Sequence, residues 1–430
     1  MKDLIEALYL TNRVFLTDEY KDCLEYIDER YLDLDFHAFP SGRVIWDSWV
    51  VPQKWTVNEA YVEAGNERVI DFADHPLHLI SYSEPFEGTI GREELLEHVH
   101  THSTLESAIP WHFRQNYRPW DSEWGFCASQ RLVDSLDRDE YYVNIDTEFE
   151  DDKMIVGEHH VEGDRKETVV LVAHLDHTGM ANDDLAGVAV GCELMERLRA
   201  KEDLTYSYKF LIVQELLGSA AYLATHEEEA DNFCYGIFLE MPGNDNRILL
   251  QRSFSGETRL DAIAEHVLDR TVEGGEAAPF RERIGNDETI FEAPGFEIPM
   301  ISISRYPYPE YHTHLDDPEI VSEDRLEEYC SYVEGVIEVL DTDFVPYRRF
   351  DGLPSLANPK YNLYIDPNDI DAGANGDVHS FRNRFVRYLD GGHTAFEIAN
   401  LFDLDFEFVR EYLVNCEERN LIRSSYPPES

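Results

Sequence analysis

The stretch Thr168-Val-Val-Leu-Val-Ala-His-Leu-Asp-His-Thr-Gly-Met-Ala-Asn-Asp-Asp-Leu-Ala-Gly187 decides the fold predicted for this chain. Its opening residues are apolar or β-branched, a run typical of a strand buried on both faces of a sheet. His174, Asp176 and Asp183 follow in the loop that leaves the strand. Open α/β sheets bind their ligands beyond the carboxyl ends of the strands. The stretch therefore predicts an α/β fold with a polar site at the sheet edge.

The side chains of this loop are of the kinds that hold zinc. His174 and Asp183 supply an imidazole and a carboxylate, and Asp176 is placed to orient the imidazole without binding the ion. The same residues are also typical of an Asp-rich surface turn before a capped helix. The loop alone leaves both interpretations open.

Strands and helices alternate along the chain after this loop. We expect a helix at 185–199, a strand at 208–213, a helix at 219–229, strands at 235–239 and 248–251, a helix at 258–269, a strand at 298–304 and a helix at 323–340. This alternation predicts a mostly parallel sheet sandwiched by helices.

Further polar residues fall at the ends of these predicted strands. Glu215 follows the strand at 208–213, and Glu240 follows the strand at 235–239. A buried acid at a strand end is costly unless it is paired or bound to a metal. His312 and His314 lie in the loop after the last strand. Every candidate thus lies at the carboxyl edge of the sheet, which favours a metal site over a surface turn.

Composition changes along the chain indicate four parts. We expect an α/β domain at 1–40 and 137–342, interrupted by a β-rich module at 41–136 that carries all six tryptophans. Residues 343–378, rich in Pro, Asn and Asp, are interpreted as an extended connector. Three short helical patterns at 379–430 with tight turns predict a winged-helix-like domain.

The formal net charge of −52 comes from 88 acids spread over the whole chain, with only eight lysines against 28 arginines. Such a charge repels itself at low ionic strength, so abundant salt is the environment that suits it. The pattern resembles the proteins of salt-accumulating, halophilic archaea. It argues against nucleic acid or an anionic membrane as a partner.

Targeting signals and cysteine patterns point to a cytoplasmic protein. We find no window of about 18 apolar residues and no apolar signal-peptide core after Met1. The six cysteines are scattered without a paired motif, so we expect them to be reduced and buried.

Five ordered motifs make the chain resemble a known family. They are His174-Leu-Asp176, Ala181-Asn-Asp183, Glu215 followed by Gly218-Ser219, Leu239-Glu-Met241, and Tyr311-His312-Thr313 with Asp316. In this order they resemble the motifs of co-catalytic zinc aminopeptidases of the bacterial leucyl-aminopeptidase type. The whole chain is more closely similar to aminopeptidase-like proteins of polysaccharide-biosynthesis loci, in which a β-rich module interrupts the peptidase domain and a winged helix follows it.

The resemblance implies a centre of one or two zinc ions. It places His174 and Glu240 on one ion, Glu215 and His312 on a second, and Asp183 between them. It further implies that Asp176 orients His174 and that Tyr311 helps to hold the oxyanion. The implied reaction is hydrolysis of an amide by zinc-activated water.

The sequence departs from the family at one position. The family carries two adjacent glutamates, a general base and a metal ligand, whereas this chain has Gln214-Glu215. If Glu215 binds metal, no obvious base remains. If it acts as the base, the site is closer to a single zinc held by His174, Asp183 and His312, with Glu240 nearby. Loss of a base would cost a factor of roughly 10²–10⁴ in rate.

Two hypotheses of function follow. The first is a metal-dependent hydrolase that cleaves a peptide or another amide-containing small molecule. The second is a catalytically weak or inactive metal-binding scaffold linked to polysaccharide or cell-envelope biosynthesis. Residues 381–430 hold nine acids and six arginines without a basic stripe. We therefore expect the C-terminal domain to serve an oligomer or a protein partner rather than DNA.

The remaining polar motifs have ordinary interpretations beside functional ones. The run from His98 to His102 continues a helical pattern, so a solvated helix end is expected rather than a metal site. The aromatic stretch from Trp111 to Trp120 is expected to pack inside the module. Asp287 is equally consistent with a helix start and with a role beside the metals.

Overall fold

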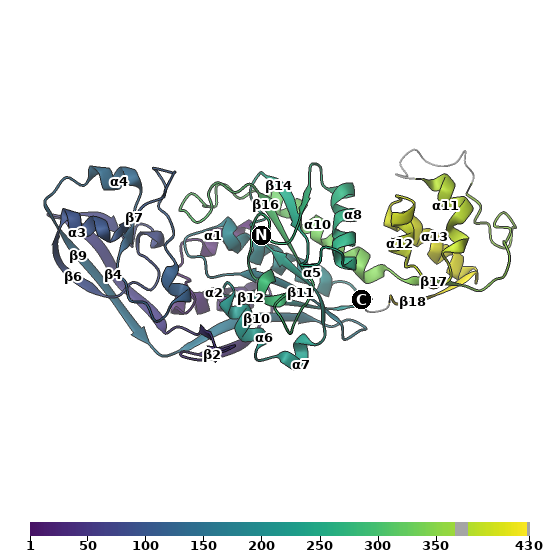
Figure 1. Cartoon of the computed structure of the whole chain (residues 1–430), viewed down its shortest axis with the longest axis horizontal. Helices are drawn as coiled ribbons and strands as arrows, with labels where there is room; N and C mark the ends of the chain where they lie inside the picture. The colour runs from purple at the N-terminus through teal and green to yellow at the C-terminus, as the bar shows by residue number, and fades with distance from the viewer. Residues whose placement is uncertain (366–376, 428–430) are drawn as a thin grey trace. The chain divides into compact units, whose positions relative to one another are not determined.

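The stretch at 168–187 lies at the centre of a sheet in the computed structural model of the chain, which describes residues 1–365 and 377–427. Within these residues eight strands form this central sheet. In spatial order they are β1 (Asp35–Pro40), β10 (Lys153–Val161), β12 (Ser207–Val213), β11 (Thr168–His174), β13 (Phe233–Leu239), β16 (Met300–Tyr306), β14 (Arg247–Gln251) and β15 (Glu276–Ala278) (Figure 1).

The middle of the central sheet is parallel. β12, β11, β13 and β16 are parallel neighbours, whereas β1, β10 and β14 join the sheet by antiparallel pairing. All residues of β11 and β12 are buried, which explains their near-continuous apolar sequences. The mostly parallel α/β fold predicted from the sequence is confirmed.

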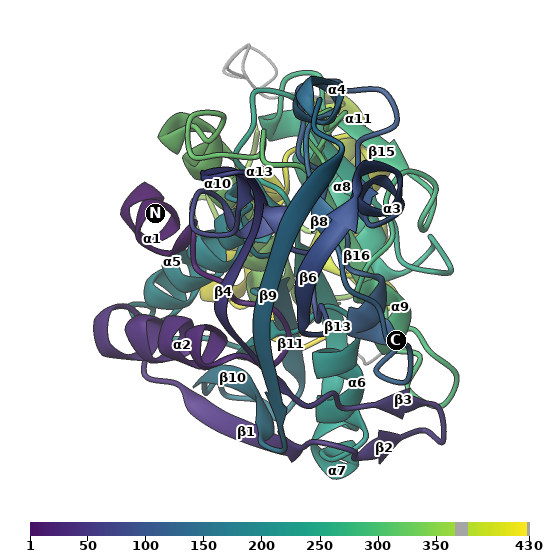
Figure 2. The same ribbon diagram turned by 90° about the vertical axis from the view of Figure 1, so that its left-hand side faces the viewer.

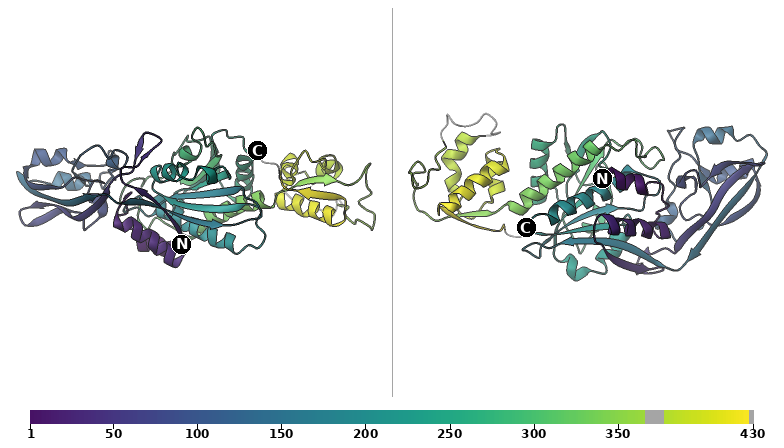
Figure 3. Two further views of the ribbon diagram at one scale, coloured as in Figure 1. Left: turned by 90° about the horizontal axis from the view of Figure 1, so that it is seen from below. Right: turned by 180° about the vertical axis from the view of Figure 1, so that it is seen from behind.

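Helices accompany the central sheet. They are α1 (Lys2–Leu8), α2 (Asp18–Arg30), α5 (Gly187–Arg199), α6 (Leu217–Leu223), α7 (Glu227–Ala230), α9 (Glu288–Phe291) and the first part of α10 (Glu323–Thr342). Thr17 starts α2, because its side chain accepts a hydrogen bond from the Tyr20 N–H. The purple helices α1 and α2 lie beside the teal strands (Figure 3). The helix predicted at 219–229 is instead divided into α6 and α7.

A second sheet, here the module sheet, is built mainly from the inserted segment. Within residues 1–365 its order is β5 (Glu67–Asp71), β4 (Lys54–Ala64), β9 (Glu140–Glu150) and β6 (Phe86–Gly91). Figure 2 shows β4, β9 and β6 side by side. β9 follows the predicted module at 41–136, yet it pairs with β4 and β6 and then leads into β10 of the central sheet. β9 thus connects the module sheet with the central sheet, and the predicted module bounds stay a prediction.

Shorter elements complete the module. They are β2 (Val44–Ile45), β3 (Trp49–Val50), β7 (Val99–His100), β8 (Phe126–Cys127), α3 (Arg92–Glu97) and α4 (Gln130–Ser135). Helix α3 ends before His98, and His100 lies in β7, so the helical pattern does not continue to His102 as expected. One apolar core runs from Trp55 and Val143 of the module to Val170 and Leu211 of the central sheet.

The chain divides into two compact units, residues 1–256 with 272–331, and residues 257–271 with 332–430. The second contains α8 (Arg259–Thr271), the later part of α10, β17 (Val345–Arg348), α11 (Val378–Arg384), α12 (Ala395–Leu401), α13 (Phe406–Glu418) and β18 (Ile422–Ser425). β17 lies in the predicted connector and pairs antiparallel with β18. Residues 366–376 of that connector lie outside the described residues. The helical C-terminal region is present, and its winged-helix character stays a prediction.

The helices give no sign of a membrane span. Across the described ranges, none combines the length and the apolar character that crossing a bilayer requires.

Close packing of α5 on the central sheet depends on a glycine. A Cβ at Gly191 would overlap the ring of Phe210 on β12. We expect Gly191→Ala to lower the free energy of unfolding by about 1–3 kcal/mol, because the packed ring cannot move aside freely. Urea denaturation at high salt measures this change. Combining it with Phe210→Leu should recover part of the loss. Unchanged denaturation of Gly191→Ala would contradict this packing.

Candidate metal centre

The predicted site residues meet where the parallel strands of the central sheet end. His174 is the last residue of β11, Glu215 comes just after β12, and Glu240 comes directly after β13. His312 lies in the loop that follows β16. Because β12, β11, β13 and β16 are adjacent and parallel, their carboxyl ends share one edge.

Asp183 is the middle of this group. Its Oδ1 lies 3.0 Å from Nε2 of His174 and 2.9 Å from Nδ1 of His177, and its Oδ2 lies 3.4 Å from Nε2 of His312. Asp183 is buried, and burial alone would raise its pKa. The neighbouring His177 and His174 outweigh burial, so the pKa of Asp183 falls well below its usual range. The carboxylate is therefore ionised.

His177 is a central residue that sequence reasoning did not single out. It is buried, with Nδ1 at Asp183 and Nε2 at 3.3 Å from Glu215 Oε2. Burial opposes its protonation, but the Asp183 charge and the hydrogen bonds to Asp183 and Glu215 raise its pKa well above the usual value. With His174 and Asp183 it forms a set of converging side chains that could hold a metal. The signal was present in the sequence as a second histidine three residues after His174.

Several buried polar atoms of the centre have no hydrogen-bond partner within the described part of the chain. Buried atoms without a hydrogen-bond partner among the described residues include Oδ2 of Asp176, Asp183, Asp184 and Asp287, and Nε2 of His312. Buried carboxylates without a cation are costly. An imidazole nitrogen and a carboxylate oxygen that face each other unbonded are the donors that zinc takes. The residues present therefore fit a divalent zinc ion.

Asn286 connects Glu240 with His174 through its side-chain amide. Its Oε1 accepts a hydrogen bond of 3.0 Å from Asn286 Nδ2, and its Oε2 accepts one of 3.3 Å from Ser302. The same Asn286 nitrogen lies 3.4 Å from Nδ1 of His174. Burial first, and then the charge of Glu288, raise the pKa of Glu240 well above its usual value. A nearby cation is what would make this carboxyl ionise.

Gln214 and Glu215 point in different directions. The Gln214 side chain is buried and donates to the carbonyls of Phe15 and Ile155 at 3.1 and 3.0 Å, away from Asp183. Glu215 turns toward the centre, where it accepts a hydrogen bond from Tyr117 and faces His177. Burial would raise the pKa of Glu215, but the hydrogen bond with His177 and its charge lower it to about 2.

Asp176 makes a hydrogen bond with the loop that carries Glu215, and its predicted role of orienting His174 stays a prediction. Asp176 Oδ1 accepts from the backbone N–H of Glu215 at 2.7 Å. Nδ1 of His174 instead faces Asn286, and Asp287 Oδ2 lies 4.0 Å from it. Asp287 also accepts from the Leu216 N–H at 3.0 Å. Asp176 and Asp287 thus position the loop that carries Glu215.

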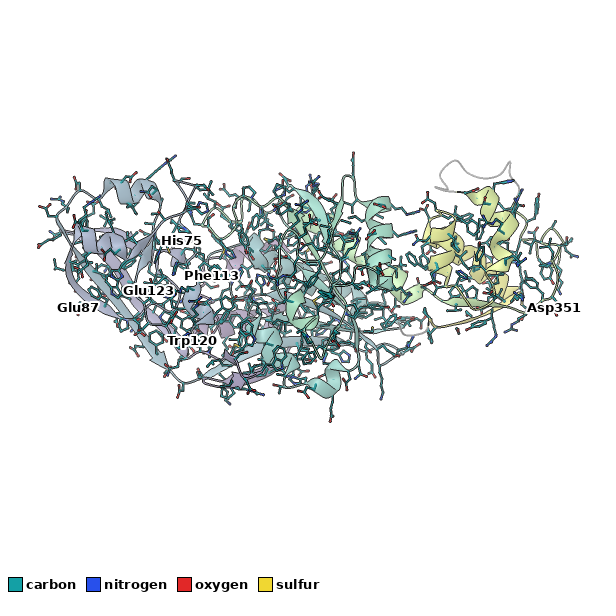
Figure 4. All side chains as sticks on the ribbon, in the orientation of Figure 1. His75, Glu87, Phe113, Trp120, Glu123 and Asp351 are labelled. Carbon is teal, nitrogen blue, oxygen red and sulfur yellow. The ribbon has the colours of Figure 1, made fainter. Side chains whose placement is uncertain are left out.

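The inserted module forms one wall of the centre. The Trp111 ring lies 4.4 Å from the His177 ring and 4.9 Å from the His312 ring, and Phe113 lies 5.1 Å from His312. Figure 4 labels Phe113 in this part of the module. Trp111 is buried in an apolar cluster, as the interior packing predicted from the sequence requires, and it also packs against the site. Trp120, at the other end of that stretch, is exposed, so the prediction is wrong there. Tyr117 comes from the same wall.

Backbone pairing fixes this wall to the loop of His312. The Trp111 N–H donates to the His312 carbonyl at 2.9 Å, and the His314 N–H donates to the Ile109 carbonyl at 3.0 Å. Nδ1 of His314 accepts from the Ile109 N–H, so this histidine closes the junction. Tyr311 stacks on His312 with ring centres 3.7 Å apart and is 43% exposed.

Three residues at this edge have left-handed backbones. They are Leu216, Met241 and His312, with φ of 58°, 44° and 54°. Residues other than glycine adopt such angles at a cost of order 1–3 kcal/mol each. Each lies at or beside a candidate site residue, and such strain clusters at functional sites.

Comparison with known proteins places the chain among aminopeptidase-like proteins. A family model described as "Domain of unknown function (DUF4910)" matches residues 2–343. A protein of Clostridium acetobutylicum, provisionally named as a polysaccharide biosynthesis protein with an aminopeptidase-like domain, is 31% identical over 344 residues, which span 78% of this chain and 77% of that protein.

Solved structures agree with this placement. A crystal structure provisionally described as a peptidase from Clostridium acetobutylicum is similar with a TM-score of 0.85 and 27% identity, covering 99% of this chain and 96% of that one. A zinc aminopeptidase from Bacillus subtilis has a TM-score of 0.57 and 15% identity, covering 78% and 93%. The second likeness is one of fold.

Asp316 offers a test of the loop that carries Asp183. Its carboxylate accepts from the backbone N–H groups of Asn182 and Asp183 at 2.7 and 2.9 Å. In Asp316→Asn one of these N–H donors would face an amide NH₂, so one of the two hydrogen bonds that fix the loop would be lost. We expect zinc affinity to fall by roughly 10- to 100-fold, as measured by competition with a chromophoric chelator. Asp317→Asn, with the same charge change, should bind zinc as the wild type does. If Asp316→Asn bound zinc as tightly as Asp317→Asn does, the role of Asp316 would be refuted.

Gln214 provides a second test. Replacing it with Glu sets a carboxylate against two backbone carbonyls in a buried site. We expect Gln214→Glu to lower the free energy of unfolding by about 3 kcal/mol without raising hydrolytic activity. Gln130→Glu is the matched surface change, because Gln130 donates to Asp134 on an exposed helix. Gained activity in Gln214→Glu would show that this position can supply a base.

Proposed function

This chain belongs to the DUF4910 family, and we propose that it is a zinc-dependent hydrolase of the aminopeptidase type. The observation that carries the proposal is Asp183, a buried carboxylate facing three imidazoles. One of its oxygens and Nε2 of His312 lack hydrogen-bond partners among the residues that the structure describes. The aminopeptidase-like fold and the names of similar proteins support a peptidase-type hydrolase.

The ligands follow from this geometry. We infer that Asp183, His174, His177 and His312 hold zinc, with Glu215 or Glu240 completing the set for one ion or two. Zinc in such a centre polarises a carbonyl and lowers the pKa of water. The resemblance implied a ligand set without His177, and the structure adds this residue as a candidate.

The residues of the chain supply the remaining chemistry. Glu215 is ionised and held by Tyr117, so its carboxylate can accept a proton at the centre. Tyr311, partly exposed beside His312, can donate from its hydroxyl to a developing oxyanion. Trp111 and Phe113 cover the His177 and His312 side and keep water from it.

The substrate proposed is an amide at a peptide N-terminus or in a sugar or cell-envelope precursor. Because Trp111 and Phe113 cover the side of His177 and His312, we expect a small molecule or a chain end rather than an internal peptide bond. The alternative, a metal-binding scaffold without turnover, is tested by the following experiment.

Activity and zinc content are measured together on the full chain. Hydrolysis of aminoacyl-anilides and N-acyl sugars is assayed at molar salt, before and after chelation and zinc replacement. We expect chelation to abolish hydrolysis and zinc to restore it. Glu215→Gln should lower kcat by roughly 10²- to 10⁴-fold. Retained zinc in that variant identifies Glu215 as the base, and lost zinc identifies it as a ligand. Glu148→Gln, on the module sheet, is the control. Bound zinc with no turnover on any substrate would overturn the hydrolase proposal.

A further inference from the structure

A second cluster of metal-binding side chains lies within the inserted module. It consists of His100 on β7, His112 before the turn at 114–117, and Glu123 before β8. Their ligand atoms all lie within 4.8 Å of one another. None of the three residues belongs to the centre around Asp183. Figure 4 labels Glu123 in the module.

The two histidines of this cluster have unused nitrogens. Nε2 of His100 and Nε2 of His112 are both buried and lack a hydrogen-bond partner among the described residues. They lie 3.8 and 3.9 Å from the two Glu123 oxygens, which is beyond hydrogen-bond reach. Two buried imidazole nitrogens that converge on a carboxylate without bonding to it leave space for a bridging ion.

The backbone holds all three residues in place. The His100 carbonyl accepts from the Ala128 N–H, the His112 carbonyl from the Ser81 N–H, and the Glu123 carbonyl from the Glu84 N–H. Gln115 Nε2 also donates to Glu123 Oε2 at 2.9 Å. These contacts fix the backbone of each donor, so binding an ion would need reorientation of the two imidazole rings rather than of the chain.

The distances suit a transition metal. Two imidazoles and a carboxylate are ligands that zinc prefers, at about 2.0–2.2 Å each, so neighbouring ligand atoms in a tetrahedron lie about 3.4 Å apart. The two distances from the histidine nitrogens to Glu123, 3.8 and 3.9 Å, are within about half an ångström of this spacing. The two rings are stacked with centres 4.0 Å apart and an angle of 13°. Because the nitrogen lone pairs lie in the ring planes, binding would tilt the rings toward each other.

We propose that His100, His112 and Glu123 form a second zinc site, separate from the centre around Asp183, with water as the fourth ligand. The site ties together three segments of a region that has little regular structure between β7 and β8. His112 follows Trp111, whose ring contacts His177 and His312. An ion here therefore fixes the segment that carries the aromatic wall.

The test removes the first centre and counts what remains. Full-length Asp183→Asn protein, loaded with zinc and dialysed at molar salt, is analysed for metal content. We expect about one zinc ion per chain to remain, and His100→Ala with His112→Ala in the same background to lose it. Equal zinc contents with and without these two histidines would overturn the proposal. Hydrolysis that survives Asp183→Asn with this zinc retained would count only against the proposed function.

Two further variants guard against misfolding. Glu123→Gln keeps the shape and an acceptor for Gln115 but removes the charge, so it should fold and yet bind zinc more weakly. His102→Asn lies in the same segment and keeps an acceptor for the Thr104 N–H, so it should retain the ion. In the Asp183→Asn background, zinc should raise the melting temperature, and Glu123→Gln should diminish that shift. An undiminished shift in Glu123→Gln would contradict the site.

Discussion

The contact between Asp183 and its histidines is the interaction on which the centre depends. One carboxylate draws His174 from β11, His177 from the following loop and His312 from a loop far along the chain. Asp316 holds the backbone of that carboxylate from the other side. Without a cation, burial and the neighbouring Glu288 raise the pKa of Glu240, whereas His177 lowers that of Glu215. The fold thus places negative charge where a cation is needed to stabilise it.

The fold and most of the candidate site could be predicted because both depend on buried parallel strands. An apolar run such as β11 is recognisable in the sequence, and the end of each such strand marks the site edge. His174, Asp183, Glu240 and His312 were found in this way. Tyr117 could not be, because it meets Glu215 across 98 residues, through packing of the module that no local pattern encodes.

The Gln214-Glu215 pair shows how strand geometry changes the meaning of a sequence. In this chain the two side chains point to different sides, and of the two only Glu215 faces the centre, where it lies beside His177. Gln214 binds Phe15 and Ile155 in the interior, and its amide satisfies carbonyls there. Gln214, which stands where the resemblance implies a base, therefore serves as an internal hydrogen-bond donor. The chemistry that the centre supports depends on Glu215 and its partners.

The backbone hydrogen bond between Trp111 and His312 makes the module part of the centre, although the module is an insertion in the sequence. An insertion is ordinarily a part that a chain gained late and can lose. Here, deleting it would expose a carbonyl beside His312, uncover His177 and remove the phenol that holds Glu215. The central sheet alone would therefore lack part of the candidate centre. The insertion and the central sheet thus form one structural unit around the centre.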